Sequence, residues 1–250
     1  MQKKIVKQSI FYFLLLIFWQ SLVMLKIWPE YILPSPLKVF GAIVEGFKNR
    51  TFLIAITVSF KRLLTGFAIS IFFGGMIGTL LVKFKTLEQT VGSLVLGLQT
   101  LPSICWFPLA LIWFGLSEWA IIFVIIAGSL FSIIMFTHSA FKNVPHIYIR
   151  AGKNMGLKDV SLLWKILIPA AIPSLLIGFR QSWSFAWRSL MAGELLFNCL
   201  GLGFLLNMGR ELNDMAQVVA VMFIIAMISI IIDMLIFNKI EQRMRLMYGL

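Results

Sequence analysis

Long apolar runs alternate with short polar segments along this chain of 250 residues. The runs cover residues 10–25, 63–82, 90–114, 119–137, 170–196 and 216–237. A helix rises about 1.5 Å per residue and the hydrocarbon core of a bilayer is about 30 Å thick, so a run of about 20 residues can cross it. The pattern predicts an all-α membrane protein with about six transmembrane helices.

The first apolar run follows three lysines and resembles a signal peptide. No small-residue cleavage site precedes Lys26, however, so we interpret residues 10–25 as a retained first span.

Prolines mark the segment between the first two runs. Pro34 and Pro36 favour an extended conformation, because proline fixes its own φ angle and restricts the residue before it. We expect a short interfacial helix over 37–47. The chain is thereby divided into 1–50, an N-terminal span with an outer loop, and 51–250, a core.

Two further prolines, Pro102 and Pro108, interrupt the third run. Its helix must kink or break, since each proline lacks a backbone N–H donor. Broken helices at membrane depth occur only where they are buried in protein or line a cavity. Gln99, Thr100 and Ser103 are therefore candidate cavity-lining groups; a kink that serves packing alone is the alternative.

In the second run, Gly74 and Gly78 form a pair of small residues four apart, which allows another helix to approach closely. Helix packing is the expected role of this pair.

Composition supports the membrane class. The chain is 60% hydrophobic and only 13% charged, whereas a soluble domain carries about a quarter charged residues. No basic run alternates with aromatic residues outside the apolar runs, which argues against nucleic acid as a partner. The polar segments that would lie on one side of the membrane, which include both termini, hold thirteen Lys or Arg, and the segments on the other side hold seven. Because Lys and Arg are more frequent on the cytoplasmic side, we expect both termini in the cytoplasm.

Candidate catalytic or metal-binding residues are few. Cys105 and Cys199 lie in apolar stretches without metal-ligand spacing, and we expect both to be small buried side chains. His138 and His146 are expected on the surface, and no His-Glu-x-x-His or Gly-x-Ser-x-Gly motif accompanies them. We therefore expect no enzymatic activity and no metal.

The fifth run contains two arginines, Arg180 and Arg188. A charge inside the membrane costs on the order of 2.5–3.5 kcal/mol on insertion scales, so each should have a polar partner or face water. Arg180, Ser184 and Arg188 share one helix face at i, i+4 and i+8. Arg188 has the donors that an oxyanion needs. The candidate translocation path comprises Arg188, Ser184, Arg180, Trp187, Glu194, Gln99 and Ser103; for Arg180 and Glu194, structural ion pairing is the alternative.

The polar segment 138–169 separates the fourth and fifth runs. Its spacing resembles the cytoplasmic signature loop of binding-protein-dependent ABC transporter permeases: Glu-Ala-Ala, three residues, Gly, nine residues, Ile, any residue, Leu-Pro. Arg150 stands where the glutamate is usual. The residues assigned to this coupling loop are Arg150, Ala151, Gly152, Met155, Gly156, Leu157, Ile166 and Pro169.

Further stretches resemble the nitrate, sulfonate and taurine branch of this family. They are residues 33–36, Arg62 with Gly66 and Phe67, residues 109–115, residues 178–180, Trp187, residues 192–194 and residues 201–203. The resemblance implies a type I importer fold in the bacterial cytoplasmic (inner) membrane. It also implies an aliphatic sulfonate or a similar small oxyanion as the transported molecule, with nitrate, taurine and a thiamine-pyrimidine precursor as alternatives.

The resemblance also implies partners. The chain has no Gly-x-x-x-x-Gly-Lys-Ser/Thr phosphate loop, so ATP would be hydrolysed by two separate ATPase subunits and no cofactor would bind this chain. A second permease copy, expected to form a homodimer, and an extracytoplasmic substrate-binding protein complete the assembly. In the loop, Gly156 would permit a turn between two short helices, and Pro169 would suit the first turn of the next span.

An ion-gradient-driven secondary transporter is the alternative from a different class. It needs acidic groups within the membrane, for which Glu194 and Asp233 are the candidates.

Overall fold

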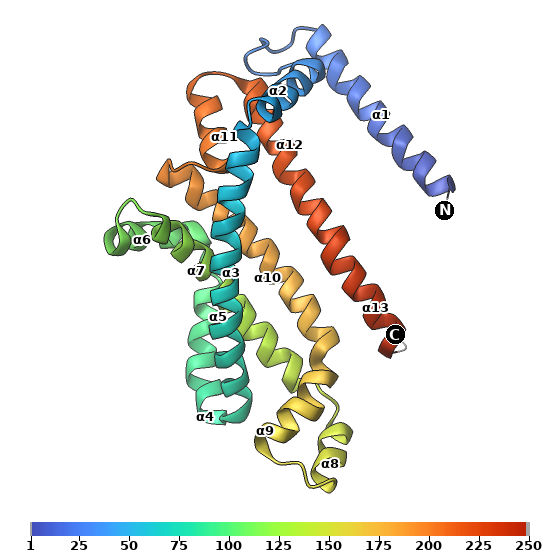
Figure 1. Ribbon diagram of the computed structural model, residues 1–250, viewed down its shortest axis with the longest axis vertical. Helices are drawn as coiled ribbons and strands as arrows, with labels where there is room; N and C mark the ends of the chain where they lie inside the picture. Colours follow the sequence, from blue (N-terminus) through green and yellow to red (C-terminus); the bar gives the residue numbers. More distant parts are fainter. Residues whose placement is uncertain (1, 249–250) are drawn as a thin grey trace. The chain divides into compact units, whose positions relative to one another are not determined.

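The computed structural model describes residues 2–248, which are almost entirely helical (Figure 1). The helices are α1 Gln2–Met24, α2 Pro36–Lys48, α3 Thr51–Lys83, α4 Lys85–Leu87, α5 Ser93–Gln99, α6 Phe107–Phe114, α7 Glu118–Lys142, α8 His146–Asn154, α9 Asp159–Leu162, α10 Ile168–Phe197, α11 Leu202–Glu211, α12 Met215–Ile232 and α13 Asn238–Tyr248. Short π-helices cover Glu88–Gly92, Leu163–Leu167 and Asp233–Phe237, and a 3₁₀ helix covers Ser103–Trp106.

Within the described residues, four helical segments are long and apolar enough to cross a membrane: Thr51–Lys83, Glu118–Lys142, Val160–Phe197 and Met215–Met244. A fifth span results if Lys85–Gln99 and Ser103–Phe114, bent by 103°, are counted together. These match five of the six predicted spans. The first run is helical as well, but its apolar part, Ile10–Met24, is shorter than the others.

The helices pack as two compact units: residues 1–58 with 198–228, and residues 59–197 with 229–250. We refer to them as unit 1 and unit 2 and describe each by itself. The predicted division of the chain at residue 50 stays a prediction.

In unit 1, the proline segment joins α1 to α2. Ser35 caps α2 by accepting a hydrogen bond from the backbone N–H of Lys38, and Pro36 occupies the first turn, where its missing donor costs nothing. The indole Nε1 of Trp19 donates to the carbonyl of Pro34 at 3.1 Å, and the Trp19 ring stacks on Phe223. The predicted short helix after the prolines is confirmed.

Residues 198–215, between the last two apolar runs, contain three glycines, a composition that favours an outer loop, but the structure is helical over most of this segment. It contains the helix α11, which buries Leu202, Leu205 and Asn207 on one side. Gly201 precedes the helix in an extended conformation, and Gly209 allows close contact with Val218 at the start of α12.

Unit 2 is built around α7, which packs along α10 (Figure 1). Residues on several sides of α7 are buried, including Ile121, Ile125, Ile133 and Ile134. A helix that is apolar all round must be surrounded by other helices.

The predicted small-residue contact brings α3 against α7. A Cβ added to Gly74 would lie 2.8 Å from Cγ2 of Ile133, and one added to Gly78 would lie 2.7 Å from the carbonyl oxygen of Ile134. One turn before Gly74 in the same stripe, Ser70 accepts a hydrogen bond from Ser129 at 2.9 Å. The two helix backbones therefore approach more closely than larger side chains would allow.

Candidate functional site

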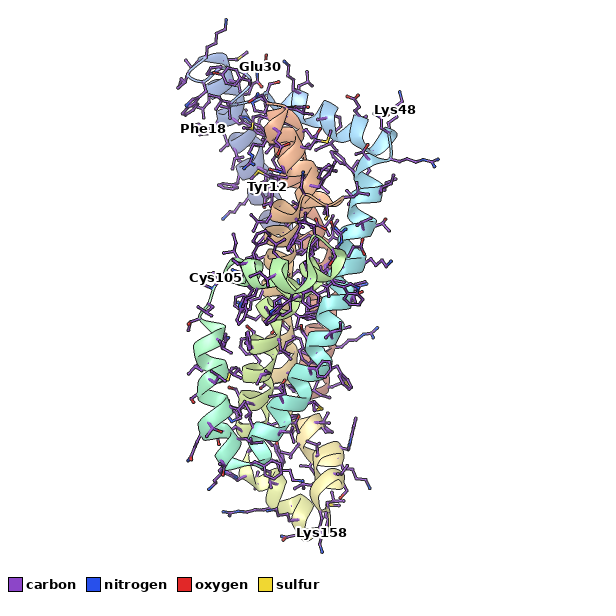
Figure 2. The ribbon with its side chains drawn as sticks, turned by 90° about the vertical axis from the view of Figure 1, so that its left-hand side faces the viewer. Tyr12, Phe18, Glu30, Lys48, Cys105 and Lys158 are labelled. Carbon is purple, nitrogen blue, oxygen red and sulfur yellow. The ribbon has the colours of Figure 1, made fainter. Side chains whose placement is uncertain are left out.

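The third predicted span is broken at Pro102, one of the two prolines that predicted a kink or a break. Helix α5 ends at Gln99, and the 3₁₀ helix Ser103–Trp106 leads into α6, which runs at a steep angle to α5. Pro102 adopts φ −55° and ψ 138°, which is not helical. In Figure 1, α6 projects sideways from the end of α5 and α7, and Figure 2 labels Cys105 in this crossing region.

A cavity of about 340 Å³ lies at this break. It is lined by Gln99, Thr100, Leu101, Pro102, Ser103, Ala127, Gly128, Phe131, Ser132, Phe185, Arg188 and Ser189. Helices α5, α7 and α10 all contribute to it. The structure thus brings together three of the predicted path residues, Gln99, Ser103 and Arg188, which come from segments about 85 residues apart in the chain.

Close contact of α7 and α10 shapes the wall of this cavity. A Cβ added to Gly128 would lie 1.8 Å from Oγ of Ser189, so only glycine fits there. On the opposite wall, the amide of Gln99 donates a hydrogen bond to Ser132 at 3.3 Å, which holds the last residue of α5 against α7.

Arg188 is exposed to the cavity and retains free donors. Within the described residues its hydrogen bond is from Nε to the carbonyl of Ser184 at 3.1 Å, and its guanidinium lies 4.7 Å from the ring centre of Phe185. Both contacts leave the terminal nitrogens, Nη1 and Nη2, available. An arginine with two free terminal nitrogens can bind an oxyanion through two parallel hydrogen bonds.

Arg180 has acidic partners instead. It donates to both carboxylate oxygens of Asp233 at 2.6 and 2.5 Å and to Glu241 at 3.0 Å. These acids lie beyond α12, in the following π-helix and in α13. Ser184, one turn on, is exposed and within 3.4 Å of the carbonyl of Arg180.

Glu194 is fully buried and belongs to an ion-pair cluster in unit 2. Ser59 donates to its carboxylate at 2.7 Å, and Nη1 of Arg62 donates to it at 3.1 Å. Nη2 of Arg62 also binds Glu118 at 3.1 Å. The alternative that Arg180 and Glu194 serve as structural ion pairs fits these contacts.

Ser59 and Arg62 were not predicted as site residues, because Arg62 was counted among the basic residues outside the membrane. Arg62 is in fact only 4% exposed within helix α3. The available signal was its spacing of three residues from Ser59, which places both on one helix face at the start of an apolar run.

Trp187 and Arg188 are adjacent in the chain, but their side chains have different neighbours. Its side chain is buried and packs against Phe60, with ring centres 6.0 Å apart, while Trp183 packs against Phe67 at 5.1 Å. The tryptophans therefore contact α3, whereas Arg188 lines the cavity.

Two predictions of side-chain exposure were wrong. His138 is buried, and its Nε2 lies 3.2 Å from a carboxylate oxygen of Glu88, which also pairs with Lys142. Cys105 was expected to be buried but is exposed, in the short 3₁₀ helix at the break of the span, while Cys199 is half-buried.

The coupling loop forms two helices joined at Gly156, as its resemblance implied. Gly156 has φ +80°, a conformation that side chains with a Cβ disfavour. The N–H of Leu157 binds the carbonyl of Gly152, and that of Gly156 binds Lys153, both at 3.0 Å. These are the two hydrogen bonds of a Schellman motif, which ends a helix at a left-handed glycine.

Other residues of the loop divide into inner and outer groups. Gly152 is buried, and a Cβ there would lie 2.7 Å from Leu162 and 2.9 Å from Ile166. Arg150, Ala151 and Met155 are exposed. In Figure 2, Lys158 marks the tip of this segment.

Pro169 is the second residue of α10 and so lies in the first turn of that helix, as predicted. The segment Val160–Phe197 is continuous through it. Directly before Pro169, the N–H of Ile168 binds the carbonyl of Leu163, five residues back. This wider turn accommodates the place where proline cannot donate.

The family model of the binding-protein-dependent transport system inner membrane component matches residues 66–246. The chain belongs to this family. It is therefore a multi-pass inner membrane permease of an ABC importer, and the family is one of permeases rather than enzymes.

Relatives agree with this membership. The permease is 36% identical to a putative ABC transporter permease protein of Methanocaldococcus jannaschii over 70% of this chain and 66% of that one. It is 25% identical to the taurine transport system permease protein TauC of Escherichia coli over 88% of this chain and 82% of that one, in line with the resemblance to the taurine branch.

A solved structure confirms the fold. The permease resembles a chain of the MetNI methionine ABC transporter, solved in inward-facing conformations, with a TM-score of 0.62 and 20% identity, over 76% of this chain and 96% of that chain. The type I importer fold is thereby confirmed.

Proposed function

We propose that this permease forms the translocation path for a small oxyanion, with taurine or another aliphatic sulfonate as the transported molecule. The observation that carries the proposal is the cavity at the broken helix, which Arg188, with its two free terminal nitrogens, lines together with Gln99, Thr100 and Ser103.

A sulfonate matches this cavity chemically. Its three oxygens accept hydrogen bonds and carry one negative charge, so the guanidinium of Arg188 can bind two of them while a hydroxyl or amide binds the third. The apolar ring of Phe185 and the backbone turn at Pro102 leave room for a short carbon chain. The similarity to a taurine permease supports the same class.

Other small molecules remain alternatives within this proposal. Nitrate offers the same charge in a smaller volume, and a thiamine-pyrimidine precursor would use the amide and hydroxyls rather than the arginine.

For the energy source, we propose two separate ATPase subunits that hydrolyse ATP and dock on the exposed face of α8, which carries Arg150 and Ala151. No cofactor would bind the permease chain, which would perform no covalent chemistry. A second copy would complete the path as a homodimer, an extracytoplasmic binding protein would deliver the substrate, and both termini would lie in the cytoplasm. Family membership supports the ATPase and binding-protein partners.

An ion-gradient-driven mechanism has less support. Its two candidate acids are both paired with arginine: Glu194 with Arg62, and Asp233 with Arg180. Both acids are thus engaged in ion pairs, whereas a coupling ion would need an acid that can bind it.

Uptake into proteoliposomes tests the proposal. The permease is reconstituted with its ATPase and binding protein, and uptake of radiolabelled taurine is measured with ATP inside. We expect Arg188→Ala to lower uptake at least about tenfold, since it removes a charge-assisted pair worth about 1.5–3 kcal/mol. Arg188→Lys should keep part of the activity, because lysine retains the charge but not the paired geometry.

Arg243→Ala provides the matched control, because Arg243 is an exposed arginine on α13 outside the cavity, and it should transport like the unaltered permease. Unchanged uptake rate and affinity in Arg188→Ala would remove Arg188 from the path. Uptake driven by a proton or sodium gradient without ATP would overturn the ABC mechanism.

A further inference from the structure

A second pocket in unit 2, of about 720 Å³, lies where the membrane-spanning helices meet the coupling loop. Its walls come from the last turns of α3 and α7, from α8, and from the segment between α9 and α10. They are mostly apolar and include Val82, Phe141, Ile149 and Leu163. This pocket shares no residue with the cavity at the broken helix.

Three lysines complete the lining of this pocket. Lys83 is the last residue of α3, Lys153 lies in the last turn of α8, and Lys158 lies between α8 and α9. All three are exposed. Three ammonium groups therefore lie around one apolar pocket and give it a basic rim.

We propose that this pocket binds an anionic phospholipid, with the phosphate at the three lysines and part of an acyl chain along the apolar walls. Lys83 and Lys142 are the last residues of two membrane-spanning helices, so this end of unit 2 lies at the depth of the lipid headgroups. Basic pockets between transmembrane helices are known sites for anionic headgroups. A lysine can reach such a headgroup while its methylene chain covers apolar surface.

The apolar walls select a lipid over a soluble phosphate. A free phosphate would use the lysines but would leave Val82, Val160 and Leu163 in contact with water. An acyl chain would cover them, at a gain of about 0.8 kcal/mol for each buried CH₂ group. Because the pocket is bounded by both the spans and the coupling loop, a bound lipid would tie the position of α8 to the ends of α3 and α7.

Lipid titration of the purified full-length permease tests this. Binding of phosphatidylglycerol and of phosphatidylcholine is measured by native mass spectrometry in a neutral detergent. We expect a clear preference for phosphatidylglycerol. The triple variant Lys83→Gln, Lys153→Gln, Lys158→Gln should weaken its binding about a hundredfold, since each lysine contributes about a factor of five.

Two further variants and one soluble probe make the outcomes distinct. Exchanging the same three lysines for arginine should preserve binding, because the charge remains. Exchanging the exposed lysines Lys26, Lys48 and Lys61 for glutamine removes the same charge elsewhere and should also preserve it. Glycerol phosphate, which has the headgroup charge without acyl chains, should not compete.

Any of four results would overturn the proposal. The first three are equal binding of both lipids, equal loss in the two glutamine variants, and effective competition by glycerol phosphate, which would assign the pocket to soluble phosphates. Loss of lipid binding when the ATPase subunits are assembled would assign the pocket to a protein partner instead. Because the assay needs neither ATP nor substrate, its failure would leave the transport proposal untouched.

Discussion

The carboxylate of Glu194 and the guanidinium of Arg62 are buried inside unit 2, with relative exposures of 0% and 4%. Ser59 donates to both oxygens of the carboxylate, at 2.7 and 2.8 Å, and Arg62 reaches Glu118 with its other terminal nitrogen. A buried pair is costly to desolvate, but it becomes far more costly when one partner is removed. These residues therefore stabilise the packing of α3 against α10 only as a set.

The Arg180 cluster should contribute less, although its hydrogen bonds are as short. The side chains of Arg180, Asp233 and Glu241 are 37%, 38% and 41% exposed, so solvent screens them.

Replacing Arg62 by alanine leaves the buried charge of Glu194 without its arginine. We expect Arg62→Ala to lower the free energy of unfolding by about 3–5 kcal/mol, measured by denaturant titration of the purified permease in detergent.

The exposed Arg188→Ala is the matched control and should change stability by no more than about 0.5 kcal/mol. Replacing Arg62 and Glu194 together by leucine removes both charges and should recover most of the loss. If Arg62→Ala were as stable as the unaltered chain, the cluster would not stabilise the fold.

At the level of elements, the contact of α3 with α7 depends on a stripe of small residues spaced four apart: Gly66, Ser70, Gly74 and Gly78. Such stripes let helices approach in membranes, where packing rather than the hydrophobic effect holds helices together. The adjacent Gly75 lies off this stripe, and a Cβ added to it would meet nothing within 4 Å.

This difference predicts opposite effects for two glycines on one helix. Gly78→Ala would place a methyl group 2.7 Å from a backbone oxygen of α7, which cannot move without shifting the helix. We expect a loss of about 1–3 kcal/mol in thermal or chemical unfolding.

Gly75→Ala should be neutral or slightly stabilising, because alanine favours the helix and has space there. Equal stability of the two variants would show that α3 does not pack on α7 through this stripe.

Some elements could be predicted from local sequence alone and others could not. Pro102 predicted the break after α5, because a missing donor acts within its own turn. For α11, the glycines suggested a loop, yet burial of Leu202 and Leu205 makes a helix there. Tertiary packing overrides weak local preference, so short helices of this kind are hard to predict.

At the scale of the whole molecule, the coupling loop has exposed residues on one side and buried residues on the other. Gly152 is buried against Leu162 and Ile166, which fixes α8 on the following segment, while Arg150 and Met155 face outward. An exposed charged residue on a rigid helix is well placed to contact a partner subunit.

Arg150 stands where the signature pattern that this loop resembles has glutamate, and a guanidinium can only donate hydrogen bonds. We therefore expect it to meet an acidic residue of the cognate ATPase. Arg150→Glu should weaken assembly at least about tenfold, as judged by co-purification of the ATPase with the tagged permease, because it replaces attraction by repulsion.

Arg210→Glu makes the same charge change on the exposed end of α11 and should leave co-purification intact. Undiminished co-purification with Arg150→Glu would refute this contact.

Local sequence was sufficient to predict the membrane class, the apolar spans and the break at Pro102, while the resemblance of the loop to a known signature pattern implied the turn at Gly156. Each of these depends on local chemistry: a continuous apolar run, a missing N–H or a missing Cβ. Only the tertiary structure decided which polar residues meet. It joined Gln99, Ser103 and Arg188 in one cavity, and paired Glu194 with Arg62 and Arg180 with Asp233. The partners of the two ion pairs lie 132 and 53 residues apart in the chain. Helix periodicity shows on which face of its own helix a residue lies, but not which other helix that face contacts.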